Sequence, residues 1–224
     1  MEARHRLTDG RRTPHLSGVR ALLLLGIALA GFASCVPAWS AREIAGKADK
    51  GLVSRMKGDW AYVPDAVGAR GDRLLLSMIP GKTSQFRYMR GKNLEQWTVN
   101  PVKIGNRMFA DVKLTSSRED STTIATWGVP ADSLRRYHLI ARFDQRGDTL
   151  LVGFLDDDAT ARWLDLNNDP LDYAEVEAHA TDVTLLDRSN NVKAFLRKVQ
   201  DVDSMFTTPV VMVRSRLEGG APAP

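Results

Sequence analysis

Cysteine, histidine and catalytic motifs are all scarce in this sequence of 224 residues. Its one cysteine, Cys35, has no partner within the chain, so no internal disulfide can stabilise the fold. No G-x-S-x-G elbow and no glycine loop of the phosphate-cradling kind occurs. These absences leave a serine hydrolase or a phosphate-binding enzyme without support, and they make a hydrophobic core the source of stability.

A basic segment followed by a short apolar run opens the sequence. Residues 21–33 carry no charge, and they are preceded by five arginines, namely Arg4, Arg6, Arg11, Arg12 and Arg20. The run is shorter than the roughly 20 residues of a membrane span, and this order is typical of a secretory signal peptide. The next residues, Phe32-Ala33-Ser34-Cys35, resemble the bacterial lipobox, although leucine is more usual where Phe32 stands. The resemblance implies that residues 1–34 are removed and that Cys35 is acylated and anchors the chain in a membrane.

Other interpretations of the N-terminal segment stay open. A plain signal peptide followed by an incidental cysteine, or an uncleaved anchor, would also fit the pattern. Arg11-Arg12 raises export by the twin-arginine route, but the residues that follow do not resemble the rest of that motif. We favour acylation because the single thiol stands at the end of the apolar run. That choice implies a cell-envelope protein, and Val36 after the cysteine favours the periplasmic side of the outer membrane over the inner membrane.

The positive charge of the chain belongs largely to this N-terminal segment. The whole sequence has a formal net charge of +4 and a pI near 9.3. Without residues 1–34, which hold five basic and two acidic residues, 26 basic and 25 acidic residues are left. No basic stripe with interleaved aromatic residues is present, so nucleic acid is not an expected partner.

The rest of the sequence predicts one β-rich domain between two irregular segments. Residues 35–57 combine charges and glycines with weak periodicity, so we expect a solvated tether that contains a short helix near residues 41–56. Residues 58–217 hold short alternating runs separated by turn residues, including two hairpin signals at residues 105–106 and 145–148. Residues 218–224 are rich in glycine, alanine and proline and predict a disordered tail. The pattern favours an antiparallel meander that closes into a small barrel, with a β-sandwich as the alternative.

Two short helices are expected late in this domain. Asp157 or Asp158 is placed to cap a helix over residues 159–167, and capping explains residues 156–158 better than paired-carboxylate catalysis does. Ser189 is placed to cap a second helix, whose apolar stripe consists of Val192, Phe195, Leu196 and Val199.

Several segments together resemble a class of uncharacterised bacterial lipoproteins with a lipocalin-like β-barrel. They are Gly58-x-Trp60, the run MFADV at residues 108–112, residues 136–156, the short helix with Trp163, and residues 181–198. The likeness covers roughly residues 58–200. It implies a barrel on a lipid tether and no catalytic set. In the lipocalin fold the tryptophan of this signature closes the bottom of the barrel, so Trp60 is expected to pack there.

The remaining polar candidates point away from chemistry. His138 and His179 fall on the polar side of predicted strands without metal-ligand spacing, so we interpret both as exposed. Residues 165–169 begin like a calcium loop, but Pro170 and Val176 stand where glycine and glutamate are needed. We therefore expect no metal, no cofactor and no catalytic residues.

Aromatic residues are the remaining candidates for a site. These side chains either fill the core of the barrel or line a ligand cavity, and we favour a filled core. The candidates are Trp60, Phe86, Tyr88, Trp97, Tyr137 and Phe143, and Phe109 and Phe154 belong to the same aromatic set. The predicted function is a non-enzymatic, lipid-anchored barrel that binds a small apolar ligand or an envelope partner. The alternatives are an assembly accessory that uses residues 115–134 for protein contacts, and a hydrolase with dispersed residues.

Overall fold

The computed structural model describes residues 37–63, 72–90, 93–117, 135–176 and 182–215. All of these residues belong to one compact unit. Cys35, His179 and the predicted tail, residues 218–224, lie outside the described residues, as does most of the segment 115–134.

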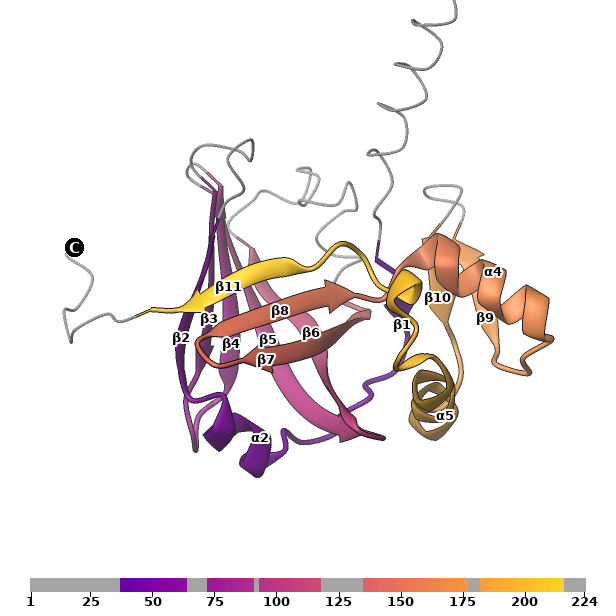
Figure 1. The fold of residues 1–224 in the computed structure, drawn as a ribbon. Coiled ribbons are helices and arrows are strands. Elements are labelled where there is room, and N and C mark those ends of the chain that lie inside the picture. Colours follow the sequence, from indigo (N-terminus) through magenta and orange to yellow (C-terminus); the bar gives the residue numbers. More distant parts are fainter. Residues whose placement is uncertain (1–36, 64–71, 91–92, 118–134, 177–181, 216–224) are drawn as a thin grey trace, which may run out of the picture. The chain divides into compact units, whose positions relative to one another are not determined.

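Eight antiparallel strands close into a barrel (Figure 1). They are β2 (Gly58–Tyr62), β3 (Asp72–Met78), β4 (Ser84–Arg90), β5 (Asn93–Ile104), β6 (Arg107–Ser117), β7 (His138–Arg146), β8 (Thr149–Phe154) and β11 (Val210–Arg214). Neighbours in sequence pair from β2 to β8, and β11 closes the ring between β8 and β2. The predicted class, a mostly β chain with a closed antiparallel barrel, is confirmed, and closure gives every barrel strand two paired neighbours.

Two-residue turns form the hairpins that the sequence signals. Gly105 and Asn106 connect β5 to β6, and Gly147 and Asp148 connect β7 to β8. Both glycines have a φ of +61°, in the left-handed region that glycine adopts without steric strain. By the strand pairing, these turns lie at the end of the barrel where β2 begins and β3 finishes, next to helix α2 (Lys50–Arg55), and we call it the lower end. The opposite end, where β2 finishes and β3 begins, is called the upper end.

A second layer covers the outer face of β6 and β7. It contains α4 (Asp157–Asn167), α5 (Ser189–Val199), the short 3-10 helix η1 (Asp203–Met205) and a three-stranded extension of the sheet. The extension pairs β1 (Trp39–Ser40) with β7, followed by β10 (Asp182–Leu185) and β9 (Tyr173–Val176). The layer lies beside the barrel in Figure 1 and shares an apolar cluster with it.

The two late helices form where the sequence predicts them, with different caps. The N-cap of α4 is Asp156, whose side chain accepts a hydrogen bond from the Ala159 amide. The α5 stripe of Val192, Phe195, Leu196 and Val199 is buried as expected. Ser189 does not cap α5; its hydroxyl donates to the Glu43 carbonyl at 2.5 Å and ties the helix to the N-terminal segment.

Residues 37–57 differ from the predicted solvated tether because they are built into the domain. Ala38 and Ile44 are fully buried and Trp39 is 3% exposed. Trp39 and Ser40 pair with β7 on one side and β10 on the other, and α2 follows. The apolar residues of this segment lack a single periodicity because Trp39 packs into the apolar cluster of the barrel interior, whereas Ala38 and Ile44 pack into the cluster shared with the second layer.

Candidate functional site

The lower part of the barrel interior is filled by side chains. Trp60 is fully buried, and its indole donates to the Met56 carbonyl at 3.0 Å next to α2. The guanidinium of Arg214 lies 4.4 Å from the Trp60 ring, donates to the Lys57 carbonyl, and pairs with Asp148 at 2.9 Å. Trp60 thus packs at the lower end, where the lipocalin-like resemblance places it.

The middle of the interior is packed by alternating large and small residues. Phe86 and Phe143 meet edge to face at 6.3 Å between ring centroids. Ala110 and Ala141 face each other on the paired strands β6 and β7. These residues belong to one buried apolar cluster that also contains Trp97. Small side chains opposite aromatic rings let a narrow barrel close around a solid core.

Partly buried side chains are concentrated toward the upper end of the interior. Of the five that pack against the interior cluster, Leu74, Tyr137, Phe154 and Val210 lie toward the upper end, and Met108 lies next to the 105–106 turn at the lower end. Tyr88 is also half-buried, and it lies directly opposite Leu74 across β3 and β4. Partly accessible interior positions are therefore more frequent toward the upper end, where they lie beside buried residues such as Leu114 and Leu139. This distribution makes the upper interior the candidate ligand site.

A buried carboxylate lies within this apolar surface. Glu95 is 3% exposed and stands directly opposite Tyr88 across β4 and β5. The Trp97 indole donates to the Glu95 carboxylate at 3.2 Å. A carboxylate is buried at a cost that hydrogen bonds must offset, so this group fixes the polarity of one side of the upper interior.

The structure brings most of the predicted aromatic residues together. Trp60, Phe86, Trp97 and Phe143 lie in the interior cluster, and Tyr137 and Phe154 pack against it. Phe109 does not, because it points outward and contacts Phe206 with ring centroids 6.1 Å apart. Glu95 was not predicted as a site residue from the sequence. Because it alternates with Trp97 and Val99 along one strand, its position on the same face as these two residues could have indicated that it is buried.

His138 is not exposed as predicted, because the second layer covers the face on which it lies. It is 9% exposed, and its Nδ1 lies 2.6 Å from Oδ1 of Asp111, which is 1% exposed. The other carboxylate oxygen accepts a hydrogen bond from the Ile44 amide at 2.6 Å. A carboxylate that orients an imidazole is common in acid–base sites, but here the pair holds the N-terminal segment against β6. Ser40, the cross-strand partner of His138, donates its hydroxyl to the Arg42 carbonyl instead of the imidazole.

The segment with the opening of a calcium loop is a helix end. Asn168 is the left-handed C-cap of α4, with a φ of 44°. Asp165 accepts a hydrogen bond from the Tyr173 hydroxyl, and Asp169 pairs with Lys198 at 2.5 Å. Among the residues that the structure describes, no group of three histidine, cysteine or acidic residues is placed to hold a metal ion.

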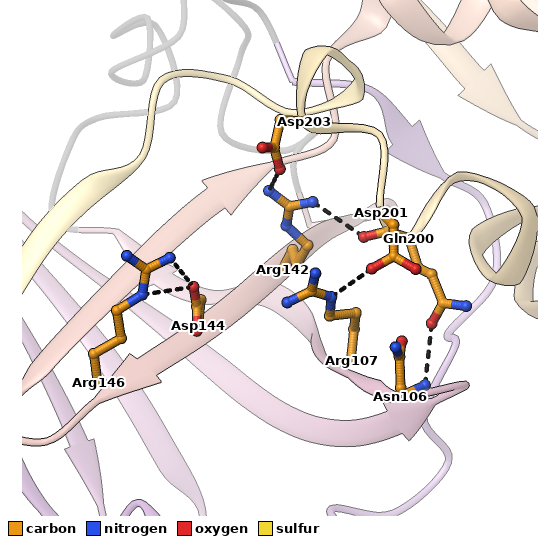
Figure 2. Close-up of polar contacts among 8 residues, drawn as sticks. All are labelled: Asn106, Arg107, Arg142, Asp144, Arg146, Gln200, Asp201 and Asp203. Carbon is orange, nitrogen blue, oxygen red and sulfur yellow. Dashed lines mark hydrogen bonds and ion pairs between the residues drawn. The ribbon is translucent and has the colours of Figure 1, made fainter.

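An ion-pair network joins the second layer to the lower part of β6 and β7 (Figure 2). Arg107 pairs with Asp201, and Arg142 pairs with Asp203, each at 2.7 Å. Arg142 also donates to the Gln200 carbonyl at 3.1 Å. The hydrogen bond to Asp201 raises the pKa of the Arg107 guanidinium. These arginines are engaged with acidic partners, so we interpret the network as structural.

Comparisons with known proteins add no closer identification. No protein-family model matches the chain, and no curated protein and no solved structure matches it. The closed eight-stranded antiparallel barrel is consistent with the lipocalin-like architecture that the sequence resembles. Within the described ranges, the helices are too short or too polar to span a bilayer.

Proposed function

We propose that this protein is a lipid-anchored lipoprotein of the bacterial cell envelope whose barrel binds a small apolar ligand without catalysing a reaction. The anchor is acylated Cys35, and the location is the periplasmic side of the outer membrane. The ligand site is the upper interior of the barrel, bordered by Leu74, Tyr88 and Tyr137, with Glu95 as its polar group.

The concentration of partly buried apolar side chains toward the upper end of the interior is the observation that carries the ligand site. The lower interior cannot admit a ligand without repacking, since Trp60, Leu76 and Met212 are fully buried there. The partly buried side chains of the upper interior offer the combination that ligand sites use, an apolar lining with a few fixed polar groups. The lipobox-like residues ending at Cys35 support the anchor, and the same sequence pattern supports the envelope location.

Native mass spectrometry of the full chain, purified in mild detergent from the membranes of a bacterial host, tests the ligand site. We expect a non-covalently bound apolar molecule. Leu74→Trp should abolish its retention because the larger ring fills the upper interior. Leu75→Trp is the matched control, since Leu75 is the next residue of β3, is also half-buried and points to the outer face.

The outcomes separate the two predicted binding modes. Equal ligand retention by the two variants would contradict the site, provided that circular dichroism shows both to be folded. A chain that carries no ligand but retains a bound protein would favour the envelope-partner alternative. Acylation is tested separately by labelling with a radioactive fatty acid, which Cys35→Ser should abolish.

A further inference from the structure

Among the described residues, exposed apolar side chains form a strip on the outer surface of the barrel, at β11 and directly after β2. Val63, Val211 and Val213 are 42%, 36% and 39% exposed, and we call these three residues the valine strip. The Val63 amide donates to the Val211 carbonyl at 3.1 Å, and Val213 lies opposite Ala61 on β2. Three of the seven large apolar residues that are exposed within the described ranges therefore meet at one place.

The strip consists of uncharged side chains on paired strands. Val211 and Val213 point outward because the alternate residue of β11, Met212, is buried in the barrel interior. Their partners on β8 are Leu151 and Thr149, which are half-buried and also uncharged. Both neighbours of β11 are paired, so the strip is a sheet face and offers no free strand edge to another chain.

The predicted anchor lies only two residues before the start of the folded barrel. Pro37 forms a bridge with Asp156, and the Ala38 amide donates to the Leu155 carbonyl at 2.7 Å. Since consecutive Cα atoms are 3.8 Å apart, the Cys35 Cα lies within about 8 Å of the Pro37 Cα. An acyl chain on Cys35 would therefore be separated from the folded domain by a single residue, Val36.

Pro37 and the valine strip are connected through β8 and the residues that follow it. Asp156, the partner of Pro37, follows Leu151 by five residues along β8 and its extension, a distance of about 17 Å at the rise of a strand. Leu151 is in turn the cross-strand partner of Val211. A barrel fixed at Pro37 can therefore rest the wall formed by β8 and β11 on the bilayer.

We propose that the valine strip is the surface through which the barrel contacts the lipid bilayer, with its apolar side chains at the level of the head groups and upper acyl chains. The inference rests on the proposed acylation of Cys35 for its setting in the cell. The occupant of the strip is the lipid surface, and a second copy of the chain is the competing occupant.

Quenching of an added tryptophan by nitroxide-labelled phospholipid in vesicles tests this contact. Val211→Trp places the probe in the strip, and Ile79→Trp places it in the β3–β4 turn at the lower end, where Ile79 is 42% exposed. The native tryptophans give the same background in both variants. We expect several-fold stronger quenching of the probe at residue 211 than of the probe at residue 79.

The lipid anchor is attached to Cys35 in two ways, so that failure of the proposed acylation can be distinguished from failure of the proposed membrane contact of the valine strip. In one arm the full chain is used as isolated from a bacterial membrane, and mass spectrometry establishes whether Cys35 carries acyl groups. In the other arm the full chain with a free Cys35 thiol is coupled to maleimide-bearing phospholipid, which is specific because the sequence has no other cysteine. A chain without acyl groups refutes the proposed anchor, whereas the coupled protein still tests the strip.

Equal quenching of the two probes in the coupled protein, or stronger quenching at residue 79, would overturn the proposal. Concentration-dependent dimerisation that Val211→Asp abolishes, without quenching of the probe at residue 211, would assign the strip to a second copy instead. Strong quenching at residue 211 that disappears when the coupled lipid is cleaved would support the proposal.

Discussion

A buried carboxylate holds the N-terminal segment on the barrel, so replacing it should destabilise the fold and release that segment. Asp111 accepts a hydrogen bond from the Ile44 amide at 2.6 Å, and its other oxygen lies 2.6 Å from His138 Nδ1. Each hydrogen bond to a charged group contributes about 1.5–3 kcal/mol. Asp111→Ala removes both and leaves a buried amide without its acceptor, so we expect a loss of about 3–5 kcal/mol from the free energy of unfolding.

A second aspartate provides the matched control. Asp144, on β7, pairs with Arg146, whose side chain is 72% exposed. Exposed ion pairs contribute about 0–1 kcal/mol, so Asp144→Ala should change the free energy of unfolding by no more than that. Asp111→Asn preserves the shape and one acceptor oxygen, and its effect should therefore fall between those of the two alanine variants.

Urea unfolding, followed by tryptophan fluorescence, measures the predicted losses. Limited digestion with trypsin under native conditions then shows where the structure opens, because Arg42 and Lys47 lie in the segment that Asp111 holds. We expect Asp111→Ala to accelerate cleavage after these two residues more than at other sites. Equal losses for Asp111→Ala and Asp144→Ala, or unchanged cleavage after Arg42, would show that the carboxylate does not hold the segment.

Three further predictions address the hairpins, the lower end and a helix terminus. Gly147→Ala should lower the free energy of unfolding by about 1–2 kcal/mol, because alanine is strained at a positive φ although nothing lies close to its Cβ. Gly105→Ala should cost about 1 kcal/mol more, because the new Cβ would displace the Gln200 side chain, which accepts a hydrogen bond from the Asn106 amide. Urea unfolding measures the difference between the two variants. Arg214→Ala should lower the free energy of unfolding by about 2 kcal/mol in the same assay, because it removes the contacts of the guanidinium with the Trp60 ring and the Lys57 carbonyl. An unchanged urea midpoint would show that these contacts do not stabilise the fold. The pKa of Asp187 is lowered, chiefly because its carboxylate accepts a hydrogen bond from the Arg188 amide. The carboxylate therefore stabilises the fold above its ordinary pKa of 3.8, and this contribution is lost as the pH falls below that value. Asp187→Asn should flatten the dependence of the free energy of unfolding on pH in this range, and an unchanged pH dependence would contradict the prediction.

Strand alternation predicted the barrel because it is a local signal. Tyr137, Leu139, Ala141 and Phe143 alternate with polar or outward residues, and the structure places them on the interior side of β7 or next to it. The two-residue turns could also be predicted from the sequence, since glycine adopts their positive φ without steric strain. These elements are specified by neighbours in sequence, so one sequence is enough to find them.

The same alternation could not predict what covers the outer face. His138 was correctly placed on the side opposite Leu139, but that side is buried by residues 37–45 rather than exposed. The alternation of side chains along a strand indicates which face of the sheet each side chain occupies, but it does not indicate whether another layer covers that face. The burial of Trp39 and Ile44 was missed for the same reason, because their contacts come from strands and helices more than 60 residues away.

Trp39 connects the two halves of the proposed function. It is only four residues beyond Cys35, yet its side chain belongs to the interior cluster of the barrel, where it lies opposite Leu139 near the upper end. A flexible tether would separate anchoring from binding, because motion of the lipid anchor would not reach the interior. Trp39, close in sequence to the predicted acylation site, is instead part of the interior cluster of the barrel. Displacement of Pro37 from the domain would therefore have to withdraw Trp39 or break the bridge between Pro37 and Asp156.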